Sequence, residues 1–116
     1  GESNSLEVNR ETMLDAVRRV RLMAQESTPL RLVMNSEGLE IVAITQDVGE
    51  GHETVDASYD GDELTVAFNP AFLVDGLDVA PGEEVSLQTI DSLKPAVLRT
   101  PGNENFLYLL MPVRVP

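Results

Sequence analysis

The sequence contains no cysteine and no tryptophan, and His52 is its only histidine. Without cysteine there is no disulfide framework, no thiolate metal site and no cysteine nucleophile. The sequence also has no run of about 18 apolar residues, the length that a membrane-spanning helix needs, and it has no signal-peptide pattern. This composition permits a cytoplasmic location, which is the one we expect.

Side chains with catalytic or metal-binding potential are few. The densest group with the spacing of metal ligands comprises Asp47, Glu50, His52 and Glu53. A structural zinc site normally has more His or Cys, and a calcium loop has a regular series of oxygen ligands, so a solvated loop is the simpler interpretation. Acids also flank Gly61, which is typical of a turn, although such acids could be paired catalytic carboxylates. We therefore expect no catalytic residue, no metal and no cofactor.

Positive charge is scarce and unevenly distributed. The net charge is −12, and residues 32–93 hold fourteen acids without a single Lys or Arg. Half of the basic residues lie in one predicted helix: Arg10, Arg18, Arg19 and Arg21. Arginines on the outer face of an amphipathic helix are normally just solvated, but a basic helix can also attract phosphates. Leu22 points almost directly away from the apolar stripe of this helix, which indicates a surface for a partner.

Two helices are predicted from capping residues and apolar spacing. The first covers residues 10 to about 25, behind the N-cap Asn9. Its buried face would consist of Met13, Ala16, Val17, Val20 and Ala24. The second helix begins after the capping Asn69, with proline at its first position. We expect it to cover residues 70–75 and to end at Gly76.

About eight strands are predicted from apolar alternation and turn signals. They cover residues 6–8, 30–34, 39–45, 54–59, 64–68, 85–90, 96–100 and 106–111. We expect strands 54–59 and 64–68 to pair as a hairpin over the acidic turn at 60–62. Isolated helices between runs of strands indicate an α+β fold with antiparallel sheets rather than a parallel nucleotide-binding sheet. No internal repeat is visible in the sequence.

The last nine residues, 108–116, form an apolar tail (YLLMPVRVP). Chain ends usually carry polar residues, whereas Arg114 is the only charged residue of this segment. Its two prolines cannot donate to a strand ladder, so we expect the segment after Met111 to leave the sheet. The tail is either a strand packed into its own core or an apolar surface that binds another chain.

This tail resembles the extreme C-terminus of the bacterial sliding clamp, the β subunit of the DNA polymerase III holoenzyme. Residues 60–73 (DGDELTVAFNPAFL) resemble a strand that leads into a helix in the third domain of that family. Residues 6–23 resemble the opening strand and first helix of the same domain. The resemblance covers residues 6–115, and it implies an α+β domain of two helices packed on two mainly antiparallel four-stranded sheets.

The resemblance also implies a domain organisation and a function. Residues 6–116 would be the third, C-terminal domain of a three-domain subunit, and residues 1–5 a linker or the remnant of a cut. In the family, two subunits close head to tail into a homodimeric ring, and helices from every domain line the central hole. Double-stranded DNA passes through the hole and is held by enclosure rather than by base readout. The ring is a processivity factor without catalytic activity.

Three sets of site residues follow from the resemblance. The pocket for short peptides of polymerases, the clamp loader and repair proteins would include Leu109, Leu110, Met111, Pro112, Val113, Arg114, Asn69, Phe72, Leu93, Pro95 and Thr28. The dimer interface would include Leu22, Met23, Glu50 and Glu53. The residues that face DNA would be Arg10, Arg18 and Arg21. A flexible Met and branched aliphatic side chains can repack around different anchors, which suits a protein with many partners.

Two other functions are consistent with the residues alone. The chain could be a stand-alone adaptor domain that binds peptides through its tail and has no role with DNA. It could also be a metal-dependent hydrolase that uses the acidic cluster at 47–53. The resemblance favours the sliding clamp over both.

Overall fold

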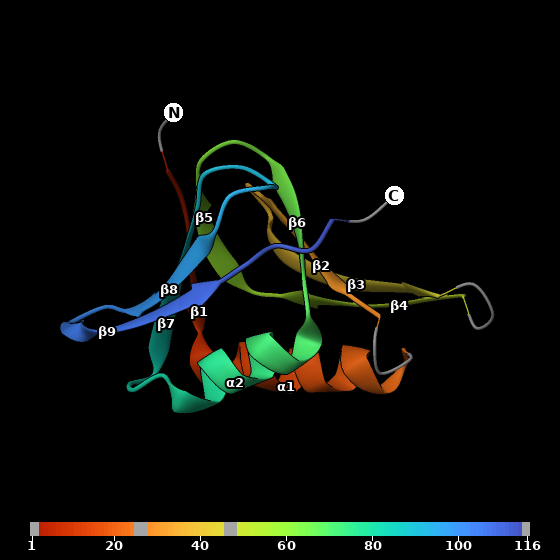
Figure 1. Ribbon diagram of the computed structural model, residues 1–116, viewed down its shortest axis with the longest axis horizontal. Coiled ribbons are helices and arrows are strands. Elements are labelled where there is room, and N and C mark those ends of the chain that lie inside the picture. The colour runs from red at the N-terminus through yellow and green to blue at the C-terminus, as the bar shows by residue number, and fades with distance from the viewer. Residues whose placement is uncertain (1–2, 25–27, 46–48, 115–116) are drawn as a thin grey trace.

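The computed structural model describes residues 3–24, 28–45 and 49–114, which form two helices and nine strands (Figure 1). The helices are α1 (Arg10–Leu22) and α2 (Pro70–Val79). The strands are β1 (Asn4–Asn9), β2 (Leu30–Asn35), β3 (Gly38–Thr45), β4 (Gly49–Val55), β5 (Ala57–Asp60), β6 (Leu64–Phe68), β7 (Glu84–Thr89), β8 (Ala96–Thr100) and β9 (Asn103–Leu110). The two helices lie side by side along one face of the molecule, and the sheets cover the other (Figure 1).

Helix α1 begins as its sequence predicts. The side chain of Asn9 accepts a hydrogen bond from the backbone N–H of Thr12 at 2.9 Å, which confirms the N-cap. The helix ends at Leu22, before the predicted end, and Gln25 lies outside the described residues. The predicted inner face is confirmed, with Met13, Ala16, Val17 and Val20 buried and Ala24 partly buried against the core. In the described ranges, no helix is long and apolar enough to cross a membrane.

Helix α2 is longer than its sequence predicts. Asn69 caps it by accepting the N–H of Ala71 at 2.9 Å, as predicted, but the helix continues through Gly76 as far as Val79. A Cβ atom at Gly76 would lie 2.8 Å from the ring of Tyr108. Glycine therefore occupies this position because β9 packs closely on the helix, and the prediction that it ends the helix is wrong.

The strands form two antiparallel sheets, one of five strands in the order β5-β1-β7-β8-β9 and one of four in the order β4-β3-β2-β6. The predicted fold class is confirmed, but one sheet has a fifth strand because the predicted strand 54–59 is two strands. β4 ends at Val55, β5 begins at Ala57, and Asp56 alone carries the chain from one sheet to the other.

The predicted hairpin of strands 54–59 and 64–68 is also wrong. β5 pairs with β1 and β6 pairs with β2, so the two segments belong to different sheets. Apolar alternation shows which face of a strand is buried but does not identify the strand beside it. This error matters for the functional site, because the pairing of β6 with β2 sets the surroundings of the tail.

The fold contains a structural repeat that is not visible in the sequence. The series β1-α1-β2-β3-β4 and β6-α2-β7-β8-β9 have the same order of elements, and the first strand of each joins the sheet of the other. The two helices differ in length, with 13 and 10 residues, and their apolar patterns differ. In each series the last strand, β4 or β9, lies at the edge of its sheet.

The hydrophobic core lies between the helices and the two sheets. It is one cluster that takes side chains from every sheet and both helices. Phe68, at the end of β6, is its largest fully buried side chain. Asn69 follows directly as the cap of α2, so the core fixes both the edge strand and the start of the helix.

Candidate functional site

The tail leaves the five-stranded sheet and crosses to the other one. β9 ends at Leu110, which confirms the predicted departure near Met111. Past Pro112 the backbone N–H of Val113 donates a hydrogen bond of 2.8 Å to the carbonyl oxygen of Ala67 in β6. β6 is the last strand of its sheet, so the tail is anchored at the open edge of that strand.

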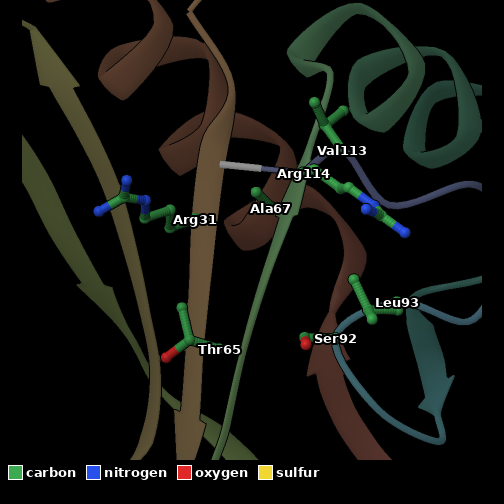
Figure 2. A pocket seen from close by; sticks show the side chains of 7 residues that line it. All are labelled: Arg31, Thr65, Ala67, Ser92, Leu93, Val113 and Arg114. Atoms are coloured by element: carbon green, nitrogen blue, oxygen red, sulfur yellow. The ribbon is translucent and has the colours of Figure 1, made fainter. Parts of the chain in front are cut away.

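A hollow of about 460 Å³ lies beside this anchor (Figure 2). It is lined by Arg31, Thr65, Ala67, Ser92, Leu93, Val113 and Arg114. Figure 2 shows these side chains coming from three places: strands β2 and β6, the loop between β7 and β8, and the tail. The lining combines aliphatic side chains with two hydroxyls and two guanidiniums, so it offers both apolar contacts and polar groups to a ligand.

The loop between β7 and β8 is held in place by Asp91. Its Oδ1 atom accepts the backbone N–H of Leu93 at 2.8 Å and that of Lys94 at 3.0 Å. The hydrogen bond from Leu93 is the main reason that the pKa of Asp91 lies below its usual value. The carboxylate thus fixes the turn that carries Ser92 and Leu93 to the rim of the hollow.

Large apolar side chains are exposed at Leu93, which lines the hollow, and on α2, β9 and the tail. The exposed fraction is 62% for Leu93, 61% for Met111, 58% for Phe72 and 54% for Leu109. Leu110 alternates with these neighbours along β9 and is buried, so it supports the strand from the core side. Exposed apolar groups from a loop, a helix and a tail are typical of an interaction surface.

Helix α2 is joined to β9 by a second polar contact. The hydroxyl of Tyr108 donates to Oδ2 of Asp75 at 2.8 Å, and the ring packs on Gly76. Burial, followed by this carboxylate, raises the pKa of Tyr108 above its usual value. The contact sets the position of the helix that carries Phe72 relative to the strand that leads into the tail.

Three of the pocket residues predicted from the sequence, Leu93, Val113 and Arg114, line the hollow. The others do not line it, and they lie in β9, in the tail, at the start of α2 and in the loop between β7 and β8: Leu109, Leu110, Met111, Pro112, Asn69, Phe72 and Pro95. Thr28 is partly buried just before β2. Sequence reasoning missed Arg31, Thr65, Ala67 and Ser92, because only the pairing of β2 with β6 brings the first three beside the tail.

A second candidate surface lies where α1 ends against the edge strand β4. Leu22 is 85% exposed and Met23 is 45% exposed. Met23 also packs on β4, since a Cβ atom added at Gly51 would lie 2.9 Å from the Cβ atom of Met23. Glu50 belongs to β4 opposite Ile44, and its side chain lies outside what the structure describes. Two exposed apolar side chains beside an open strand edge indicate an interface.

Glu53 contributes an ion pair to this surface from within the chain. Its carboxylate receives the guanidinium of Arg19 in a bidentate contact of 2.5 and 2.7 Å. The hydrogen bond from Arg19 is the main reason that the pKa of Glu53 is lowered. The pair ties the end of α1 to β4 and occupies both oxygens of one predicted interface acid.

The three arginines predicted to face DNA have different surroundings. Arg10 donates to the carbonyl oxygens of Gly82 and Leu77 at 3.0 Å each and pairs with Glu11 at 2.6 Å, and only 19% of its side chain is exposed. Arg18 is exposed, with Asp78 at 4.0 Å. Arg21 has no ion pair among the described residues and lies beside Arg18. The cations available to an external anion are therefore Arg18 and Arg21.

The acidic cluster predicted as a solvated loop is for the most part a strand. Residues 49–53 belong to β4, and Asp47 lies outside the described residues. His52 lies 3.2 Å from Glu40 on the neighbouring strand β3. Within residues 3–24, 28–45 and 49–114, no group of three or more His, Cys, Asp or Glu side chains could hold a metal ion.

Comparison with known proteins identifies the family. A model of the family described as "DNA polymerase III beta subunit, C-terminal domain" matches residues 1–114. The beta sliding clamp of Streptomyces coelicolor is 38% identical over 108 residues, which are 88% of this chain and 29% of that protein. The beta sliding clamp of Bacillus subtilis is 30% identical over 111 residues, 92% of this chain and 29% of that protein.

Solved structures agree with these matches. The crystal structure of the DNA polymerase sliding clamp from Bacillus subtilis superposes with a TM-score of 0.93 at 28% identity, over 100% of this chain and 32% of that one. A Bartonella birtlesii sliding clamp bound to griselimycin superposes with a TM-score of 0.90 at 30% identity, over 97% of this chain and 30% of that one. The chain thus spans about three tenths of the length of its relatives. It belongs to the DNA polymerase III beta subunit family, whose C-terminal domain it matches.

Proposed function

We propose that this chain is the third domain of a sliding clamp subunit of the bacterial replicative polymerase. The domain includes the whole of β1, from Asn4 onward. Two three-domain subunits close into a ring around double-stranded DNA, and the ring holds polymerases, the clamp loader and repair proteins through short peptides. The subunit has no catalytic activity. The family membership supports this proposal, and the geometry of the tail is the structural observation that supports it most strongly.

The anchored tail is the observation that favours a peptide pocket. The hydrogen bond from Val113 to Ala67 holds the tail beside Leu93, and Met111 stays exposed next to this anchor. A thioether side chain adapts to anchors of different shape. A rigid strand edge combined with an adaptable Met is a suitable surface for several partners that share only a short motif.

The end of α1 and the edge strand β4 supply the proposed dimer interface. Leu22 and Met23 are exposed here beside an open strand edge. Burying a Leu side chain contributes about 1.5–3 kcal/mol, so these two residues can provide much of the contact. Glu50 and Glu53 add acidic charge for basic residues of the neighbouring subunit, although Arg19 already neutralises Glu53 in part.

Arg18 and Arg21 are the residues of α1 that we propose to face DNA. Arg18 is exposed and Arg21 is partly exposed beside it, whereas Arg10 donates to backbone carbonyls within the domain. Few phosphate contacts give weak and salt-dependent attraction, which lets a ring slide. A stand-alone peptide-binding adaptor would share the pocket, but it would give no role to the exposed Leu22.

A methyl NMR titration tests the proposed pocket. The four methionines serve as probes: Met13 and Met34 are buried, Met23 lies at the end of α1, and Met111 lies in the tail. The ligand is a short peptide that contains a Gln followed by a Leu/Phe cluster, and we call it the core peptide. We expect its addition to shift the Met111 methyl signal and to leave those of Met13 and Met34 unchanged. No shift of Met111 at millimolar peptide would contradict the proposed pocket on this chain.

Replacing Leu22 with aspartate is expected to convert the full-length subunit from dimer to monomer without destabilising the domain. A carboxylate at an interface core must be desolvated without a partner, which costs several kcal/mol. Because Leu22 is 85% exposed in the isolated domain, the substitution should change the melting temperature of that domain little. Sedimentation velocity measures the dimer, and Ile90→Asp, at another exposed apolar position, is the matched control. A Leu22→Asp subunit that stays dimeric would place the interface elsewhere.

A further inference from the structure

The open edge of β6 has hydrogen-bonding groups that the described part of the tail, up to Arg114, does not use. The carbonyl oxygen of Ala67 points to the tail, where it accepts the N–H of Val113. In an antiparallel strand the backbone groups of alternate residues point to the same side, so the N–H and C=O of Thr65 point to this edge too. Among the described residues, neither group has a partner there. Thr65 also lines the hollow, where an incoming chain would reach it.

Two arginine side chains lie near this edge, one on each side of β6. Figure 2 shows Arg31 on β2, one strand in from the edge, with its guanidinium directed away from β6, and Arg114 beside Leu93 on the other side of β6. Neither arginine has an ion pair with a described residue. An Arg side chain is longer than the spacing of about 4.8 Å between strands, so a rotation of the Arg31 side chain would bring its guanidinium across β6. Only the small side chains of Thr65 and Ala67 lie on its path.

This local positive charge contrasts with the rest of the surface. The chain carries a net charge of −12, and Arg31 is the last cation before a stretch of 62 residues, 32–93, that has none. Charge repulsion from distant acids is screened beyond about 10 Å at moderate ionic strength. An acidic segment is therefore repelled by most of the acidic surface and attracted at this hollow, which gives the site selectivity by charge.

From these observations we propose that the hollow binds an extended, acidic peptide segment that pairs with the backbone of Thr65 at the open edge of β6. Arg31 and Arg114 receive the carboxylates that face the hollow, and Leu93 and Val113 pack on the aliphatic side chains of the segment. The proposal rests on the proposed peptide pocket and adds to it a strand-pairing extension with a charge preference. Side chains of an extended chain alternate between the two faces of the sheet, so of two consecutive acids one faces the hollow and its arginines in either register.

Matched peptide extensions test the proposal on this chain. The core peptide is lengthened at either end by Thr-Asp-Asp-Val or by its neutral analogue Thr-Asn-Asn-Val. One of the two ends of the core peptide must lie next to Thr65. At that end, we expect the peptide with the acidic extension to bind about fivefold more tightly than the peptide with the neutral one, in line with the strength of charge-assisted hydrogen bonds. The Thr65 amide signal should shift and its hydrogen exchange should slow. An equal affinity of the two extensions at both ends would overturn the charge preference.

Variants separate the backbone contact from the charge contacts. Thr65→Pro removes the N–H at the strand edge, where proline is tolerated, and should abolish the gain from the extension, whereas Thr65→Ala should retain it. Arg31→Gln and Arg114→Gln should each reduce the difference between acidic and neutral peptides, and Arg99→Gln, on β8 of the other sheet, is the control.

The core peptide distinguishes the two proposals. Retained binding of the core peptide to Thr65→Pro shows that the variant is folded. If the core peptide binds and no extension adds affinity or shifts Thr65, the strand-pairing extension is wrong and the pocket stands. If the core peptide does not bind the wild-type chain, both proposals are overturned.

Discussion

Replacing Phe68 with alanine is expected to lower the free energy of unfolding by about 3–5 kcal/mol. Phe68 is completely buried and is the largest of the fully buried side chains. Its removal loses apolar burial and leaves a cavity that the two surrounding sheets and α2 cannot close. Domains of this size are stable by about 5–15 kcal/mol in total, so the variant should be close to the limit of folding. Urea unfolding followed by circular dichroism measures the loss.

Phe72→Ala is the matched control for this prediction. Phe72 is 58% exposed and belongs to the same chain segment, four residues away. Its replacement should change stability by less than about 1 kcal/mol, since little burial is lost, but it should weaken binding of the core peptide. Equal destabilisation by the two variants would mean that the core is not organised around the end of β6.

The Phe68 variant should also disturb the tail. Phe68 lies between Ala67, which anchors Val113, and Asn69, which caps α2. A looser end of β6 would therefore loosen the anchor and the helix start together. A urea titration of the same variant followed by methyl NMR tests this coupling, and we expect the Met111 signal to broaden or shift before the domain unfolds globally.

The parts of the fold that depend on local chemistry were predictable from the sequence. Asn9 and Asn69 cap the two helices as expected, because a capping bond involves residues only two or three positions apart. The inner face of α1 follows from apolar spacing alone. The departure of the tail after β9 follows from its prolines.

The features that were missed depend on contacts between distant segments. Gly76 has the sequence context of a helix stop, and only the packing of Tyr108 from β9 gives it another role. The hollow was predicted in part, since Arg31 and Thr65 have no pattern that indicates a site. They meet the tail because β6 pairs with β2, and a single sequence does not specify which strands are neighbours.

The contacts of the arginines of α1 also depend on distant segments. A helical wheel places Arg10, Arg18 and Arg21 outside the apolar stripe, and the resemblance assigned all three to DNA. In the structure, Arg10 donates to the carbonyl oxygens of Leu77, in α2, and of Gly82, in the loop after it. A guanidinium that donates to backbone carbonyls stabilises the contact between the two helices, and this use is not visible in the spacing of residues along α1.

Replacing Val113 with proline should have the largest effect on the pocket, with only a small effect on stability. The substitution removes the N–H that donates to Ala67 at 2.8 Å, and it keeps the extended backbone that Pro112 already favours. Loss of one such hydrogen bond costs about 1 kcal/mol of stability. The tail would then have to be ordered again whenever a peptide binds, at about 1–2 kcal/mol for each residue fixed. With Met111, Pro112 and position 113 affected, we expect the affinity for the core peptide to fall about tenfold or more.

Val113→Ala is the control, because it keeps the N–H and removes only the aliphatic side chain that lines the hollow. It should reduce the affinity for the core peptide by a smaller factor and leave the tail ordered, as measured by ¹⁵N relaxation of Met111. If Val113→Pro bound the core peptide as tightly as the wild-type chain, the bond to Ala67 would not shape the pocket. If Val113→Ala were the weaker of the two, the pocket would depend on the aliphatic surface of the tail, and its attachment to β6 would be of minor importance.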